Sequence, residues 1–344
     1  MILYFCIFLV GIIFLFSLNN LQKKYKFCLD TITLDEPHKK LLKLNKNVPL
    51  SGNYFFIIPV ILILLSLSIE AMLICMLFFI IGLFSDIKIL SSPKKRFLLQ
   101  YLALIIFIYL NKDLIIDTKI NLINDFINHP IYRILIVSFF FLVLINGFNF
   151  IDGVNNLCSF NLLLIFIFLY FVFFKINLIF LSDKILIIII LMFVFVIFNF
   201  FGNNFLGDGA VYGLSFLVGF LCIKASNFSD TFSPYFYSNL LWYPAFENLF
   251  SIIRRSLNKK KNYLADNWHL HHLIYKMLDN KLLIKKKYIV SSLTGLIINF
   301  YLLIIYIISY FYHSKTNIQI IITLFSITVY LISYFYLKKI NKKI

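Results

Sequence analysis

The longest apolar runs decide which folds are open to this chain. Two of them read "MILYFCIFLVGIIFLFSL" at the start and "ILIIIILMFVFVIFNF" over residues 185–200, and neither contains a charged residue. A bilayer core about 30 Å thick is crossed by about 20 apolar residues in a helix. The runs therefore predict membrane-spanning helices rather than the core of a soluble domain.

The composition agrees with this interpretation. Hydrophobic residues make up 61% of the chain, and 42 residues are Phe. Phe recurs around whole predicted helices, whereas a soluble helix would confine it to one stripe. A transmembrane β-barrel would alternate apolar and polar residues, and these runs do not. We predict an all-α fold, a polytopic transmembrane helical bundle of about 10–11 spans, in which 1–344 form a single integral membrane domain.

The boundaries of the expected spans are loose. No positive charge precedes the first apolar run and the basic stretch "QKKYK" follows it, which favours a retained helix over a cleaved signal peptide. The second and third spans are short enough to form a hairpin. The expected spans lie at roughly 1–18, 53–69, 70–84, 97–111, 131–147, 157–180, 185–200, 210–226, 236–253, 288–312 and 317–337.

Lysine and arginine are distributed unevenly among the connecting segments. If the N-terminus lies outside and the C-terminus inside, the inner segments hold most of the 32 lysine and arginine residues. This is the orientation that the positive-inside rule predicts. The net charge of +17 either only fixes this orientation or also attracts an anionic lipid surface or a phosphate-bearing ligand. Nucleic-acid binding is not expected, because no soluble basic domain carries the charge. The predicted cytoplasmic loops are 19–52, 85–96, 148–156, 201–209 and 254–287.

A polar segment, "GFNFIDGVNNL", separates two apolar runs at residues 147–157. Carboxylate and amide oxygens are ligands that Mg²⁺ accepts, usually together with waters and substrate phosphates. Asp-Gly and Asn-Asn also favour an ordinary polar turn. Asp152 stands at the mouth of a predicted helix between Asn149 and Asn155, and we prefer a site to a plain turn.

Four other polar clusters fall on the same predicted side of the membrane. Residues 34–56 form a basic loop that contains Lys40, and residues 82–100 place Asp86 directly after a span. Residues 199–213 place Asp208 between two glycines at the start of the next span, as an N-cap or an anion site. Residues 266–275 contain three histidines within four positions, and no zinc-protease pattern such as HExxH accompanies them.

In this order, the five clusters resemble the motifs of the polyprenyl-phosphate N-acetylhexosamine-1-phosphate transferase family, also called glycosyltransferase family 4. The stretch "DEPHKK…VPLSGNYFF" is similar to DxPxxRK…PxxGG, and "GLFSDIKILSSPKKRFLLQ" is similar to GxxDDxxxxSPKxRxxxQ. "NGFNFIDGVNNL" resembles NAxNxxDGxDGL, "NFLGDGAVYG" resembles FxGDxGSxxxG, and "HLHH" resembles HxHH. The resemblance covers about residues 34–275. The HLHH form and the preceding IIRR favour the surface-polysaccharide and O-antigen initiating branch.

The resemblance implies a reaction at the cytoplasmic face of a bacterial inner membrane. A polyprenyl (undecaprenyl) phosphate attacks the β-phosphate of a UDP-N-acetylhexosamine and UMP leaves, with Mg²⁺ as cofactor and Mn²⁺ as an alternative. A homodimer is left open. The implied catalytic and metal-binding residues are Asp86, Asp152 and Asp208. The implied substrate- or phosphate-binding residues are Lys40, Lys94, Asn149, Asn155, Asn199, His269, His271 and His272.

The chain departs from the family pattern at two positions. Ser85 replaces the first acid of the paired motif, and Asn155 replaces the second acid of the DG motif. A base at position 85 is dispensable in principle, because the second pKa of a phosphate monoester is about 6. One alternative is therefore a catalytically impaired member that binds lipid or sugar nucleotide. A transporter or flippase is a weaker alternative, because it predicts charges near the membrane midplane, whereas Lys175, Lys224 and Glu70 lie near span ends.

Overall fold

The computed structural model describes residues 2–30, 47–112, 114, 117–257, 267–282 and 284–341. Almost all of these residues lie in helices, as the sequence predicts. A single short antiparallel ribbon, β1 (Leu29–Asp30) with β2 (Val48–Pro49), is present in the described ranges. The helices are α1 (Ile2–Tyr25), α3 (Gly52–Phe55), α4 (Ile57–Leu64), α5 (Ile69–Asp86), α6 (Pro93–Leu110), α7 (Asn121–Asn128), α8 (Pro130–Ile151), α9 (Leu157–Lys175), α10 (Ile179–Phe200), α11 (Asp208–Phe228), α12 (Pro234–Leu257), α13 (Leu270–Leu282), α14 (Lys287–Phe311) and α15 (Thr316–Asn341).

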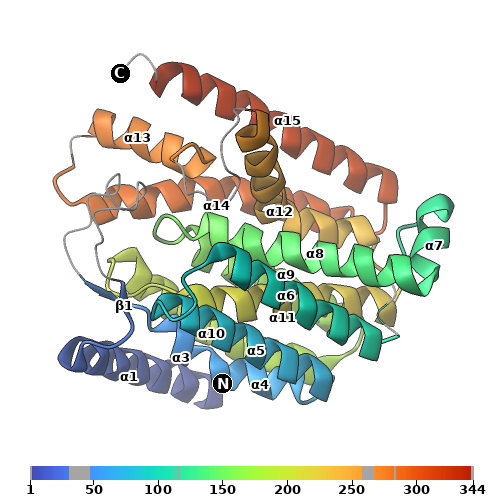
Figure 1. The fold of residues 1–344 in the computed structure, drawn as a ribbon, viewed down its shortest axis with the longest axis horizontal. Helices are drawn as coiled ribbons and strands as arrows, with labels where there is room; N and C mark the ends of the chain where they lie inside the picture. Colours follow the sequence, from blue (N-terminus) through green and yellow to red (C-terminus); the bar gives the residue numbers. More distant parts are fainter. Residues whose placement is uncertain are drawn as a thin grey trace.

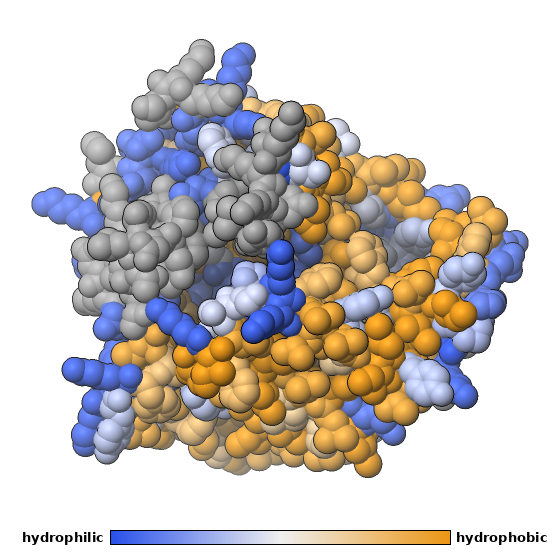
Figure 2. Space-filling view, viewed as in Figure 1, coloured by the Kyte–Doolittle hydropathy of each residue, from blue (hydrophilic) through white to orange (hydrophobic). Residues whose placement is uncertain are grey.

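Eight of the described helices are long and apolar enough to cross a membrane, so the predicted polytopic helical bundle is confirmed. They are α1, α5, α8, α9, α10, α11, α14 and α15. Apolar side chains cover the middle of the molecule, and hydrophilic residues gather towards its two ends (Figure 2). This distribution is the one expected of a protein whose middle lies in hydrocarbon.

The other expected spans correspond to less apolar helices. Segment 97–111 lies in α6, which begins with a proline and three basic residues, and segment 236–253 lies in α12, which contains Glu247 and a terminal arginine pair. Segment 53–69 is divided between α3 and the short helix α4, and a turn joins α4 to α5 as the expected hairpin requires. Helix α5 starts at an N-cap, where the Ser68 hydroxyl accepts from the backbone N–H of Ala71 at 3.1 Å.

Helix α11 lies at the centre of the bundle (Figure 1), packed against α5, α8 and α9. Most of its side chains are buried, and small residues recur along it. At Gly213 an added Cβ would overlap the ring of Phe79, so α5 and α11 come closer than larger side chains would permit. Helices α1 and α15 lie on opposite sides of the bundle in Figure 1 and leave many apolar side chains exposed.

Candidate active site

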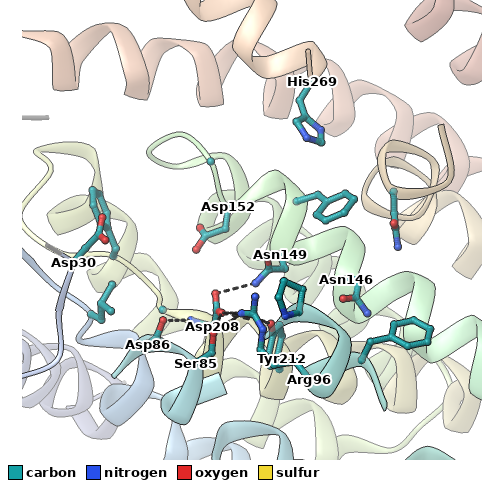
Figure 3. A pocket seen from close by; sticks show the side chains of 18 of the residues that line it. Asp30, Ser85, Asp86, Arg96, Asn146, Asn149, Asp152, Asp208, Tyr212 and His269 are labelled. Carbon is teal, nitrogen blue, oxygen red and sulfur yellow. Dashed lines mark hydrogen bonds and ion pairs between the residues drawn. The ribbon is translucent and has the colours of Figure 1, made fainter. Parts of the chain in front are cut away.

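A cavity of about 1020 Å³ opens at one end of the bundle, where α5, α8 and α12 end and α6 and α11 begin. Four of the five polar clusters supply charged, amide or imidazole side chains to its wall, although they lie up to about two hundred residues apart. The residues of the first cluster up to position 46, Lys40 included, lie outside the described residues. The predicted site residues that line the cavity are Asp86, Lys94, Asn149, Asp152, Asn155, Asn199, Asp208, His269 and His272 (Figure 3).

Asp86 and Asp208 are brought together by glycines at the crossing of two helices. An added Cβ at Gly82 would overlap the backbone of Asp208 and Gly209, so α5 meets the first turn of α11 backbone to backbone. One turn after Gly82, the carboxylate of Asp86 accepts the backbone N–H of Asp208 at 3.2 Å. Asp86 therefore satisfies one of the free N–H groups at the start of α11.

Asn53, in α3, links the end of α5 to the first turn of α11. Its amide nitrogen donates to Asp86 at 2.7 Å, and its amide oxygen accepts the backbone N–H of Ala210 at 2.9 Å. An added Cβ at Gly207, where φ is +81°, would lie 2.6 Å from the Asn53 side chain. The "PLSGN" and "GDG" segments therefore interlock, and both the positive φ and the close approach require glycine at position 207.

The carboxylate of Asp208 is held by several donors. Its Oδ1 accepts from Asn149 at 2.9 Å, and its Oδ2 accepts from Ser85 at 2.6 Å and from the Arg96 guanidinium at 2.7 Å. Tyr212 donates a longer hydrogen bond of 3.4 Å. Arg96 also donates to the Ser85 hydroxyl. Asp208 is therefore neutralised by the protein itself, and Ser85 takes part in this network (Figure 3).

Asp152 contrasts with Asp208. It follows the last residue of α8, is only partly buried, and its carboxylate makes no hydrogen bond or ion pair with any residue that the structure describes. Figure 3 shows this carboxylate pointing into the cavity, apart from the Asp208 network. Desolvation, followed by the charges of Asp208 and Asp86, raises the pKa of Asp152 above its ordinary value. A cation in the cavity would relieve this repulsion and stabilise the carboxylate.

The turn after Asp152 is fixed by buried amides. Asn156 adopts a left-handed conformation with φ +61°, and its N–H donates to the Asn199 side chain at 2.6 Å. The Asn299 amide donates to the Asn156 carbonyl at 2.8 Å. The Asn155 N–H donates to the Ser291 hydroxyl at 2.9 Å, and its side chain is buried in the cavity wall. The Asn199 side chain thus holds the DG turn in place, while Asn155 is placed at the cavity.

The histidine cluster closes the cavity on the side of α12 and α13. An added Cβ at Gly153 would lie 2.7 Å from Nε2 of His271 and 3.2 Å from Nε2 of His272, so the DG motif packs directly against these rings. All three histidines are buried. His269 and His272 line the cavity, whereas His271 lies behind them with its ring centroid 4.3 Å from that of His272.

Several residues of this region were not among the predicted site residues, Asp30 and Tyr212 of the cavity lining among them. Arg96 and Arg255 line the cavity, Asn53 braces Asp86, and Glu247 contacts His269. The sequence did contain signals for two of them, since Arg96 falls on the basic position of the "SPKKR" motif and Arg255 ends "IIRR". Asn53 lies in "VPLSGNYFF", the segment similar to PxxGG, but it replaces the second glycine of that pattern. Glu247 lies outside the five clusters, and only the packing of distant helices reveals its role.

The donor set fits a hard divalent cation that shares its coordination with a ligand. No group of three His, Cys, Asp or Glu side chains in the described ranges forms a ready metal cage. Mg²⁺ is commonly held by one or two carboxylates together with waters and substrate phosphates. Asp152 is free for that role, while the oxygens of Asp86 and Asp208 already accept hydrogen bonds from the protein.

Fold and cavity together define a polytopic membrane protein with an acid-lined cavity at one end of its bundle. Residues 68–226 match the model of the family described as Glycosyl transferase family 4. The matched region contains Asp86, Asp152 and Asp208 and ends before the histidine cluster. No curated protein matches the chain. The family match supports a transferase activity of the polyprenyl-phosphate sugar-phosphate kind.

Proposed function

We propose that the protein transfers a sugar 1-phosphate, N-acetylhexosamine 1-phosphate in the first instance, from a UDP-sugar to a membrane polyprenyl phosphate and releases UMP. The observation that carries this proposal is the convergence of four aspartates, two arginines and two histidines on one cavity at a bundle end. The family match over residues 68–226 supports the same class of reaction. The product would begin the synthesis of a cell-surface polysaccharide.

The reaction needs positioning and charge compensation more than covalent chemistry. An oxygen of the lipid phosphate attacks the β-phosphorus of the UDP-sugar, and the bond from that phosphorus to the oxygen bridging it to the α-phosphate breaks. The bridging oxygen leaves with UMP, and the lipid carries a diphosphate that ends in the sugar. At neutral pH the lipid phosphate is largely a dianion, since its second pKa is about 6, so the attack does not depend on an acid at position 85.

The chain's own residues divide the remaining tasks. Asp152, whose carboxylate has no partner among the described residues, would hold Mg²⁺, or Mn²⁺, against the diphosphate. When bound, the cation supplies positive charge that stabilises the phosphate oxygens in the transition state. Lys94, Arg255 and His272 at the cavity wall bind and orient the phosphates. Asp208 orients Arg96 and Asn149 and keeps the floor of the cavity polar.

The cavity's position suits substrates from two phases. It lies at the hydrophilic end of the bundle beside the apolar belt, so a lipid phosphate can stay anchored in the bilayer while the nucleotide arrives from water. The positive-inside rule assigns this end to the cytoplasm, where UDP-sugars are made. We therefore propose a multi-pass protein of the bacterial inner membrane with its active site on the cytoplasmic face.

The direct test is a turnover assay with purified protein, polyprenyl phosphate, Mg²⁺ and a panel of UDP-sugars, with UMP release followed. We expect UMP from at least one UDP-N-acetylhexosamine, lost on chelation of the metal and restored by Mg²⁺. A folded protein that releases no UMP from any donor would overturn the proposal.

A catalytically impaired relative is the second candidate, because Ser85 and Asn155 replace two acids of the family pattern. Such a protein would bind UDP-sugar or lipid phosphate without turnover. Nucleotide binding measured on the same preparation separates the two candidates, since binding without UMP release favours the impaired relative.

A further inference from the structure

A carboxylate lies inside the bundle, behind the wall of the cavity. Glu247, in the cytoplasmic half of α12, has no exposed surface and does not line the cavity. A buried carboxylate in a protein embedded in hydrocarbon is costly unless it is paired or hydrogen-bonded. A residue of this kind therefore needs a reason to be present, and its partners indicate what the reason is.

Both oxygens of Glu247 are engaged by groups from other elements. Oε1 lies 2.9 Å from Nδ1 of His269, just before α13, and Oε2 accepts from the Tyr330 hydroxyl of α15 at 2.6 Å. His269 lines the cavity, whereas the buried Tyr330 does not. Glu247 thus joins the wall of the cavity to the packed interior of the bundle.

The other ring nitrogen of His269 faces a cation. Its Nε2 lies 3.2 Å from the Nη2 of Arg255, which itself lines the cavity. A guanidinium can only donate, so it requires a lone pair on Nε2. The proton of a neutral imidazole then sits on Nδ1, where the Glu247 carboxylate accepts it. One tautomer satisfies both contacts.

A third residue holds the same arrangement from α8. The ring of Phe150 lies 5.2 Å from the Arg255 guanidinium carbon and 5.5 Å, centroid to centroid, from the His269 ring. Arg255 is therefore confined between an aromatic face and an imidazole lone pair. The carboxylate, imidazole and guanidinium form a chain that leads from the bundle interior to the cavity wall.

We propose that Glu247 is a positioning residue that holds His269 as its Nδ1–H tautomer, so that the Nε2 lone pair orients Arg255 towards an anionic nucleotide phosphate in the cavity. This inference rests on the proposed function. The imidazole separates the buried carboxylate from the guanidinium, so Glu247 acts on Arg255 through His269.

The decisive variant is Glu247→Gln, which keeps the size of the side chain and removes its charge. The amide cannot enforce one tautomer, because it offers both a donor and an acceptor. We expect the KM for the UDP-sugar to rise about 10–100-fold, as for other residues that orient a ligand-binding histidine. The KM for polyprenyl phosphate should stay unchanged, and the thermal unfolding temperature should not fall, because removing a buried charge relieves desolvation.

Two hydroxyl deletions provide a matched comparison. Tyr330→Phe removes one hydrogen bond to Glu247, and the KM for the UDP-sugar should rise by less than about tenfold. Tyr306→Phe removes another buried hydroxyl, which donates to the Leu240 carbonyl at 2.8 Å and accepts from the Asn161 amide at 3.0 Å, and Tyr306 does not line the cavity. It should leave both KM values as in the wild type. Equal nucleotide KM values in wild type and Glu247→Gln would overturn the proposal, as would an equal rise in Tyr306→Phe.

Nitrogen-15 NMR of labelled imidazoles gives a readout that does not depend on turnover. With the His269 signals assigned by comparison with His269→Gln, the wild type should show a protonated Nδ1 and an unprotonated Nε2. A protonated Nε2 would overturn the proposal even in an active enzyme. If the wild type releases no UMP but shows the expected tautomer, the proposed function fails while the positioning role of Glu247 stands.

Discussion

Asp208 and Asp152 line the same cavity, and the protein surrounds their carboxylates in opposite ways. Asp208 is bound by Ser85, Arg96 and Asn149, whereas Asp152 has no partner among the described residues. Both are aspartates of short polar motifs at helix ends, and the sequence predicts the same catalytic and metal-binding role for each. The difference teaches that one carboxylate organises the protein around the site while the other is available to a ligand.

The strongest test of this contrast is Asp152→Asn. The amide retains the size of the side chain but loses the charge that would hold the cation, so kcat should fall by about 10²–10³-fold. Thermal stability should not decrease, because the native carboxylate receives no protein donor that the amide would lose. UMP release together with a thermal melt in the same detergent measures both effects. A large loss of stability would contradict this prediction, because it would show that the Asp152 carboxylate, like that of Asp208, stabilises the fold.

Arg96→Met tests the other half of the comparison. It leaves the Asp208 carboxylate without its cation, and we expect a loss of about 1–3 kcal/mol in stability. The value lies below that of a fully buried pair, because 21% and 26% of the two side chains are exposed.

Adding Asp208→Asn to Arg96→Met should recover most of the lost stability, since the uncompensated charge is then removed as well. Chemical denaturation of the two single variants and the double variant completes the cycle. Additive losses in the double variant would show that the ion pair does not stabilise the native state.

Gly82→Ala tests the helix crossing that places Asp86 beside Asp208. The new methyl group meets the backbone of α11, which cannot move aside, so we expect a loss of about 1–2 kcal/mol and lower activity. Gly11→Ala is the matched control, because its methyl group would meet only the flexible end of the Leu191 side chain closely, at 2.9 Å. Thermal melts of the two variants should differ, and equal melting temperatures would argue against a rigid crossing.

Ser85→Asp should have the smallest effect. The new carboxylate enters a network that already contains the Arg96 guanidinium, which can neutralise a second acid. We expect activity to be retained or raised, with any loss below about tenfold, or 1.4 kcal/mol. The UMP-release assay decides the matter. Abolished turnover would mean that the serine is required for the arrangement of Asp208.

The helices were predictable because their signal is local. Long uncharged runs and their polar ends located every spanning helix. The departures are α6 and α12, whose basic or carboxylate residues reduce their hydropathy, and segment 53–69, which is divided between α3 and α4. The motif order also placed Asp86, Asp152 and Asp208 in the candidate site. Their separate environments were not predictable, since Asn53 and Arg96 reach them only after α3 and α6 have packed against α5 and α11.

The sequence by itself determined the class of the protein, the helices that cross the membrane and the acids and histidines that mark the candidate site. These properties follow from hydropathy and from short motifs, which act over a few residues. The tertiary structure decided that the Asp152 carboxylate has no partner among the described residues and that Arg96 pairs with Asp208. It also decided that Glu247 contacts His269. The physical reason is that hydrogen bonds and burial join helices far apart in the chain, so the environment of each charge is set only by packing.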